Sequence, residues 1–248
     1  MSDQLKTISY TDETAKEIVK KFCDHVHWLV RVRHTFKVLF EDEQPSCQTL
    51  MKKTAWSFFV DLNRILHEYL LLECAKITDP PTTTRGDTNF TVDYLVQNIC
   101  WPSDKAILEK LTSLRDGHKD KDMLRELKLL QRIAQRFRGN IKSARNKLLA
   151  HLDMSAVLSS KPLGEFPEDN AKTFFCALQK LCNITHEACF GTIYGEMSPI
   201  TVGGGDVINL RKTLECAVAF KEALSESSGQ EKTHLLLLWQ KAGHEPKS

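Results

Sequence analysis

The residues best suited to chemistry stand in one string, Arg145-Asn146-Lys147-Leu148-Leu149-Ala150-His151-Leu152-Asp153. A histidine accepts or donates a proton near neutral pH, and an arginine can bind two phosphate oxygens at once. On a helix, Arg145 and His151 lie about 120° apart, so they flank a groove rather than share one stripe. These residue types suit reactions at a phosphodiester, although their spacing alone does not single out that chemistry.

The string ends a segment with a regular apolar pattern. Apolar residues recur at steps of three and four, which predicts a long helix over about residues 120–152 with one buried face. The next step of the pattern falls on His151. The predicted buried seam consists of Leu127, Leu130, Ala134, Phe137, Ile141, Ala144 and Leu148.

The same segment concentrates positive charge. The whole chain is nearly balanced, with 34 Lys+Arg against 32 Asp+Glu, yet residues 127–151 hold seven bases and no acid. Clustered bases favour phosphate binding, and we take Arg138, Lys142 and Lys147 as candidate contacts to the backbone of a nucleic acid. The alternative, a solvated helix face paired with acids elsewhere, remains open from the residues alone.

The rest of the chain predicts an all-α fold. Only 11 Gly and 8 Pro occur, and no alternating strand pattern extends beyond a few residues. We expect a bundle of six or seven helices over residues 1–224, followed by a polar tail or marginal helix at 225–248. The expected helices cover about 12–40, 49–77, 90–99, 103–116, 120–152, 170–194 and 206–224.

Several classes of protein are excluded by composition. No apolar run approaches the roughly 18 residues of a membrane span, and the polar start Met1-Ser2-Asp3-Gln4 does not resemble a secretory signal. Eight cysteines without a C-x-x-C pair indicate reduced thiols and a cytoplasmic protein. Cys182, His186 and Cys189 have spacing that zinc could use, but their apolar neighbours favour core thiols. We therefore expect no metal and no cofactor.

Two stretches together resemble a known family. The string R-N-K-x-x-A-H-x-D, late in a long helix, resembles the HEPN superfamily. The earlier stretch Leu70-Leu71-Leu72-Glu73-Cys74-Ala75-Lys76-Ile77-Thr78-Asp79-Pro80 narrows the resemblance to the abortive-infection U-type branch. It covers roughly residues 12–220, and it implies a HEPN-like helical bundle that forms homodimers.

The resemblance also implies an activity, metal-independent cleavage of RNA in phage defence or a toxin–antitoxin system. Arg145, Asn146 and His151 would then be catalytic, and Asp153 would support His151 or cap the following turn. A second interpretation is a non-catalytic HEPN module that binds RNA or a partner protein, such as an antitoxin or a nucleotidyltransferase. A third is a helical interaction protein whose basic helix packs on an acidic partner.

Overall fold

The computed structural model describes residues 12–41, 45–82, 88–98, 119–144, 168–195 and 205–241. These residues divide into two compact units. The first unit takes in the described residues up to Arg33 and those from Leu66 to Gly195. The second takes in residues 34–65 and those from Gly205 onward.

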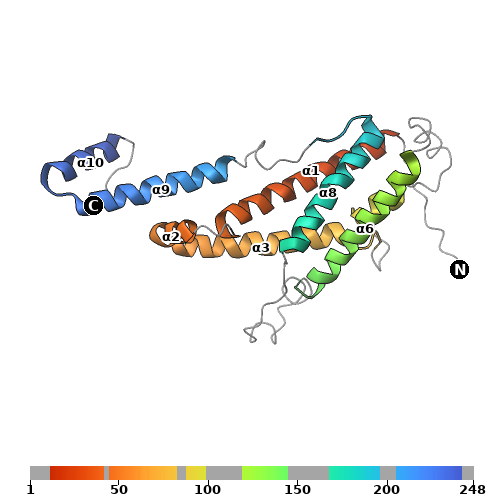
Figure 1. The fold of residues 1–248 in the computed structure, drawn as a ribbon, viewed down its shortest axis with the longest axis horizontal. Coiled ribbons are helices and arrows are strands. Elements are labelled where there is room, and N and C mark those ends of the chain that lie inside the picture. The colour runs from red at the N-terminus through yellow and green to blue at the C-terminus, as the bar shows by residue number, and fades with distance from the viewer. Residues whose placement is uncertain are drawn as a thin grey trace. The chain divides into compact units, whose positions relative to one another are not determined.

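The first unit contains most of the helices (Figure 1). They are α1 (Asp12–Phe36) as far as Arg33, the second part of α3 (Trp56–Thr78), α4 (Val92–Asn98), α6 (Lys119–Ala144) and α8 (Glu168–Phe190). Each contributes apolar side chains at helical spacing to one core. On α1 the fully buried residues are Val19, Phe22, Cys23, Val26 and Leu29.

The end of α3 and the start of α4 are fixed by side-chain capping bonds. The Thr78 hydroxyl donates to the Cys74 carbonyl at 2.7 Å, and the helix stops before Pro80 because a residue preceding proline disfavours the helical conformation. At the start of α4, the Thr91 hydroxyl accepts from the Tyr94 amide at 3.2 Å, as an N-cap residue does. Both threonines are buried, so these two helix ends are held in the core.

Helices α6 and α8 lie side by side (Figure 1) and make the most extensive contact between helices in the described structure. At its centre the rings of Phe137 and Phe174 stack in parallel, with centroids 4.1 Å apart and planes 5° apart. Around this pair, Leu127, Leu130, Ala134 and Ile141 of α6 are buried. The predicted seam is confirmed at these positions.

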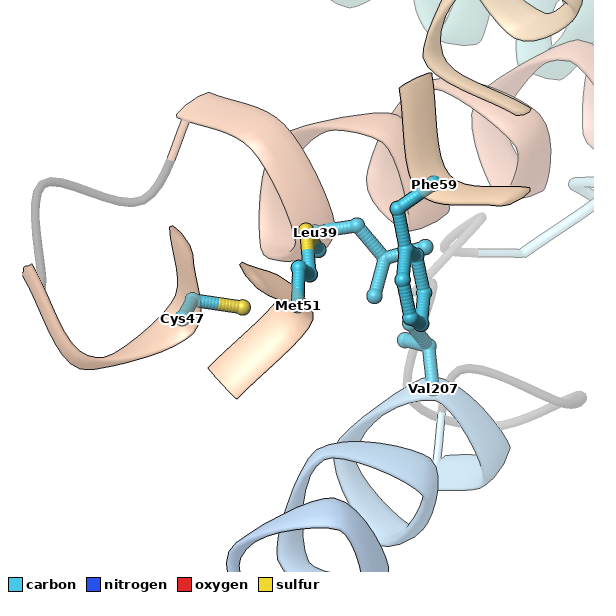
Figure 2. Packing of buried hydrophobic residues seen from close by; sticks show 5 residues of the cluster. All are labelled: Leu39, Cys47, Met51, Phe59 and Val207. Carbon is cyan, nitrogen blue, oxygen red and sulfur yellow. The ribbon is translucent and has the colours of Figure 1, made fainter. Parts of the chain in front are cut away.

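The second unit has its own small core, which Figure 2 shows. It joins the π-helix η1 (Lys37–Glu41), α2 (Pro45–Thr54), the first part of α3 and α9 (Gly205–Glu226), and α10 (Gly229–Lys241) packs on α9. The side chains of Leu39, Met51, Phe59 and Val207 converge there, with Cys47 beside them. An ion pair between Lys53 and Glu222 also links α2 to α9.

The all-α prediction is confirmed, since the described residues form helices and no strand. Up to Glu226 the described residues contain seven α-helices, in agreement with the six or seven expected for that part of the chain. Residues 229–241, expected as tail or marginal helix, form α10. The segment expected as one helix from about Thr49 is α2 and α3, interrupted at Ala55. The expected helix at 103–116 and the stretch 145–152 lie outside the described residues.

Candidate functional site

Three faces of α6 have different surroundings, and the difference follows from the helical repeat of about 100° per residue. The seam packs on α8 and the core. A quarter turn away lies the flank row, Gln131, Gln135, Arg138 and Lys142. Roughly opposite the seam lies the outer row, Arg125, Lys128, Arg132 and Arg136. The site is built from these faces.

The first two members of the flank row hold α6 against α4. The amide of Gln131 donates to Asp93 Oδ1 at 2.7 Å. Gln135 donates to the same oxygen at 3.2 Å. One carboxylate of α4 therefore accepts hydrogen bonds from two successive turns of α6. These bonds fix the rotation of α6 about its axis and its position along that axis. These glutamines serve the fold rather than an incoming ligand.

Arg138, a predicted RNA contact, pairs with an acid. Its Nε lies 3.7 Å from Oδ1 of Asp79, the residue that directly follows α3. The Asp79 side chain is 13% exposed and the Arg138 side chain 34% exposed. The contact joins α6 to the first of the two stretches singled out in the sequence, which ends at Asp79-Pro80. It leaves part of the guanidinium surface open to solvent.

Lys142, the last flank-row residue, is exposed. Among the described residues it has no ion-pair partner, so its charge is available to an anion. Helix α6 is described as far as Ala144. Arg145, Asn146, Lys147, His151 and Asp153 lie outside the described residues, and their placement as catalytic, RNA-binding and supporting groups stays a prediction.

Three members of the outer row, Lys128, Arg132 and Arg136, were among the seven bases counted in the sequence, where no function was assigned to them; Arg125 lies before that segment. All four of its bases are exposed, and none has an ion-pair partner within the described part of the chain. The sequence does not distinguish the outer row from the flank row, because the acids that contact the flank row, Asp79 and Asp93, belong to distant parts of the chain. The useful sequence signal is the spacing 125, 128, 132, 136, which keeps a base on one face at every turn.

The stretch that includes Asp79 carries a second charged group further back on α3. Glu73, 8% exposed, accepts from Lys76 Nζ at 2.6 Å and lies 3.4 Å from Nε2 of His25 on α1. Burial lowers the pKa of His25 below its ordinary value, Glu73 opposes that shift, and Lys76 adds to it. The contact between His25 and Glu73 joins α1 to α3.

The prediction of core thiols is confirmed in the first unit for Cys23, Cys74 and Cys182, which are buried, and is wrong for Cys176, which is exposed, and for Cys189, which is only partly buried. Cys182 on α8 is fully buried, and the Cys23 thiol donates to its carbonyl oxygen at 3.9 Å. Burial raises the pKa of Cys182 and of Cys74 well above the ordinary thiol value, which keeps both protonated and unreactive. His186 stacks on Phe190 and places Nδ1 2.7 Å from the Thr192 carbonyl oxygen. In the described segments, no three metal-ligating side chains form a group.

The family follows from a comparison with known proteins. The family model HEPN_AbiU2, described as AbiU2, matches residues 12–194 of the 248. The chain belongs to the HEPN_AbiU2 family. No curated protein and no solved structure matches it.

The AbiU2 match runs from the first residue of α1 to Tyr194, just beyond α8. It includes every described helix of the first unit, α6 among them, and both stretches on which the resemblance was based. Helices α9 and α10 lie outside the match. Among the described helices, none is long and apolar enough to span a membrane.

Proposed function

We propose that this HEPN_AbiU2 protein is a metal-independent endoribonuclease that acts in phage defence or as the toxin of a toxin–antitoxin system. The observation that carries the proposal is the position of the family's string directly after α6. That helix is locked by its seam on one side and by Asp79 and Asp93 on another. A rigid helix is a suitable support for groups that must be held within a fraction of an ångström.

The proposed reaction needs a base, an acid and a cation. Histidine of the string can serve as base or acid, and arginine is the cation. His151 of one protomer removes the proton from a ribose 2′-OH, and that oxygen attacks the adjacent phosphorus. The bond from phosphorus to the 5′-oxygen breaks, and His151 of the second protomer gives a proton to that leaving oxygen. The products are a 2′,3′-cyclic phosphate and a 5′-OH end.

The remaining residues bind or orient. Arg145 binds the non-bridging phosphate oxygens as their charge grows in the transition state. Asn146 donates to the same phosphate or orients a partner. Asp153 accepts from His151 and fixes its tautomer. Lys142, Lys147 and the open side of Arg138 hold the RNA backbone on either side of the cleaved bond.

The mechanism requires two copies of the string in one cleft. A two-fold homodimer provides them most simply, because an isologous contact places the same patch of each protomer opposite itself. We therefore place residues 145–153 at the dimer interface. The chain would be inactive as a monomer, since one protomer supplies only one His151.

The test is cleavage of a labelled single-stranded RNA in the presence of excess EDTA. We expect fragments that carry a 5′-OH and a 2′,3′-cyclic phosphate, identified by kinase labelling and by mass. Arg145→Ala should weaken binding and slow the reaction. Lys142→Ala should weaken binding and leave the rate at saturating RNA almost normal. Cleavage that disappears with EDTA would contradict the metal-independent mechanism.

A second function fits family membership equally well. The protein would then be a non-catalytic HEPN module that binds RNA or a partner such as an antitoxin or nucleotidyltransferase. The ion pair of Arg138 favours this alternative. Asp79 lies 3.7 Å from the Arg138 guanidinium and partly neutralises its charge. Under this alternative, RNA is bound but remains intact, and substitution of His151 changes neither result.

A further inference from the structure

The outer row of α6 is a stripe of positive charge whose bases have no acidic partner among the described side chains. Arg125, Lys128, Arg132 and Arg136 are all exposed. Their steps of three, four and four residues keep them on one side of the helix over about 16 Å of its length. In the described structure, no acidic side chain forms an ion pair with any of them.

The acidic side chains that pair with α6 in the described structure lie to the sides of this stripe. Asp79 and Asp93 face the flank row. Helix α6 itself carries Asp120, Asp122 and Glu126, and the one among them whose side chain is described, Glu126, lies 3.9 Å from Lys180 of α8. Arg138 pairs with Asp79 and Glu126 pairs with Lys180, so charges at the sides of α6 are partly neutralised. No outer-row base has an ion-pair partner in the described structure. The positive potential of α6 is therefore concentrated on the side away from the core.

The chemistry of the stripe favours a polyanion over a protein partner. Protein interfaces are centred on buried aromatic or apolar anchors. The face between Arg125 and Arg136 offers one large exposed apolar side chain, Leu129 at 53% exposure, and single exposed leucines are ordinary. A row of bases at each helical turn instead matches a chain of phosphates, whose binding is driven by release of counterions.

We propose that the outer row of α6 is a second RNA-contact surface, which holds the sugar–phosphate backbone of single-stranded RNA away from the cleavage site. This inference rests on the function proposed above for its choice of RNA as the polyanion. The row contacts phosphates only, because it presents no aromatic side chain on which a base could stack. It therefore adds affinity and dependence on RNA length without sequence preference.

The experiment measures binding of RNA in the His151→Ala background, which keeps the RNA intact. The test variant adds Arg132→Ala and Arg136→Ala. The matched control adds Lys212→Ala and Lys221→Ala, two exposed bases of α9, which remove the same charge elsewhere. Fluorescence anisotropy with a labelled 20-nucleotide single strand gives Kd between 50 and 200 mM salt, and circular dichroism checks that each variant is folded.

We expect the outer-row variant to bind more weakly than the control. The slope of log K against log salt should become shallower by about 1.4, which is about 0.7 for each lost phosphate contact to a single strand. A Kd and slope equal to those of the control would overturn the inference, and so would the absence of RNA binding at any salt concentration. Unchanged RNA binding combined with lost binding of an acidic protein would assign the row to that partner instead.

A cleavage arm with His151 intact separates this inference from the proposed function. If the protein binds RNA through the outer row but never cleaves it, the nuclease proposal fails and the inference stands. If RNA is cleaved and the outer-row substitutions alter neither KM nor Kd, the inference fails and the nuclease proposal stands. With both correct, the outer-row variant shows a raised KM and a nearly unchanged kcat.

Discussion

Asp79 and Arg138 form an ion pair of 3.7 Å between the end of α3 and the middle of α6. Both residues lie within the part of the chain that matches the HEPN_AbiU2 family. Arg145, the first residue of the predicted catalytic string, follows Arg138 by seven positions in the sequence and lies outside the described residues. Asp79 therefore has two functions to test, one in holding the helix and one in limiting the charge that Arg138 offers to an anion.

Removal of the Asp79 charge should cost little stability. Because the Arg138 side chain is 34% exposed, solvent screens the pair, and we expect a coupling of about 0.5–1 kcal/mol. Urea unfolding of Asp79→Asn, Arg138→Gln and the double variant measures it in a double-mutant cycle. Strictly additive single effects would show that the pair contributes nothing to stability.

The stacked rings of Phe137 and Phe174 should be the most sensitive contact between α6 and α8. Phe137 is 2% exposed and Phe174 is fully buried, so Phe137→Ala leaves a cavity that its neighbours cannot fill. We expect a loss of about 3–5 kcal/mol in the free energy of unfolding. Phe137→Leu, which keeps most of the volume, should cost less than half as much. Equal losses for Leu and Ala would mean that packing volume is not what stabilises this contact.

The periodicity of α6 was predictable because it is local. Steps of three and four residues determine which side chains face inward, and Leu127, Leu130, Phe137 and Ile141 are buried as expected. The partners of the flank row were not predictable, since Asp93 and Gln131 are 38 positions apart. Only the packing of α4 against α6 brings them together, and no local pattern encodes that contact.

The interruption between α2 and α3 was also missed, because it is slight. The Ala55 amide still donates to the Met51 carbonyl at 3.1 Å, and the Phe59 amide donates to the Ala55 carbonyl at 3.1 Å. The apolar pattern continues past Ala55, so periodicity alone gave a single helix. The string from Arg145 to Asp153 lies outside the described residues, and its geometry stays a prediction.

Helix α9 should depend on Val207 to stay docked in the second unit. Val207 is 6% exposed and belongs to the cluster of Leu39, Met51 and Phe59. Val207→Asp places an unpaired carboxylate among these side chains, at a cost of several kcal/mol. We expect hydrogen exchange across α9 to accelerate by at least tenfold. Asn209→Asp, at an exposed position of the same helix, is the control and should leave exchange unchanged. Protection retained in Val207→Asp would contradict this docking.

Protonation of His25 should make the protein less stable in mild acid. Its pKa is lowered in the folded state, chiefly by burial, while the unfolded chain titrates at about 6.5. Below that value the unfolded state binds more protons, so stability decreases as the pH falls from about 6.5 to the folded-state pKa and is constant below it. Above about 7 the group has no effect.

The matched variant for this titration is His25→Gln, which removes the ionisable group and keeps a polar side chain. Urea unfolding at pH 7.5 and pH 5.5 should show a larger loss of stability in the unsubstituted protein than in the variant. A larger loss in the variant would reverse the sign of the argument and show that the interaction with Glu73, which favours the charged imidazole, outweighs burial.

Assembly is testable independently of activity. Light scattering at micromolar concentration should give a mass twice that of the 28.3 kDa chain, because the proposed site needs two strings. A chain that stays monomeric would remove the second His151 from the mechanism.

The central claim is tested most directly by the single-turnover rate of RNA cleavage, in EDTA, for the unsubstituted protein and for His151→Ala. The account predicts that the substitution lowers the rate by about 10²–10⁴-fold, the usual effect of losing a positioned acid or base. RNA affinity and the unfolding transition should stay close to those of the unsubstituted protein. A folded His151→Ala protein that cleaves RNA at the unsubstituted rate would contradict the assignment of His151 and with it the proposed mechanism.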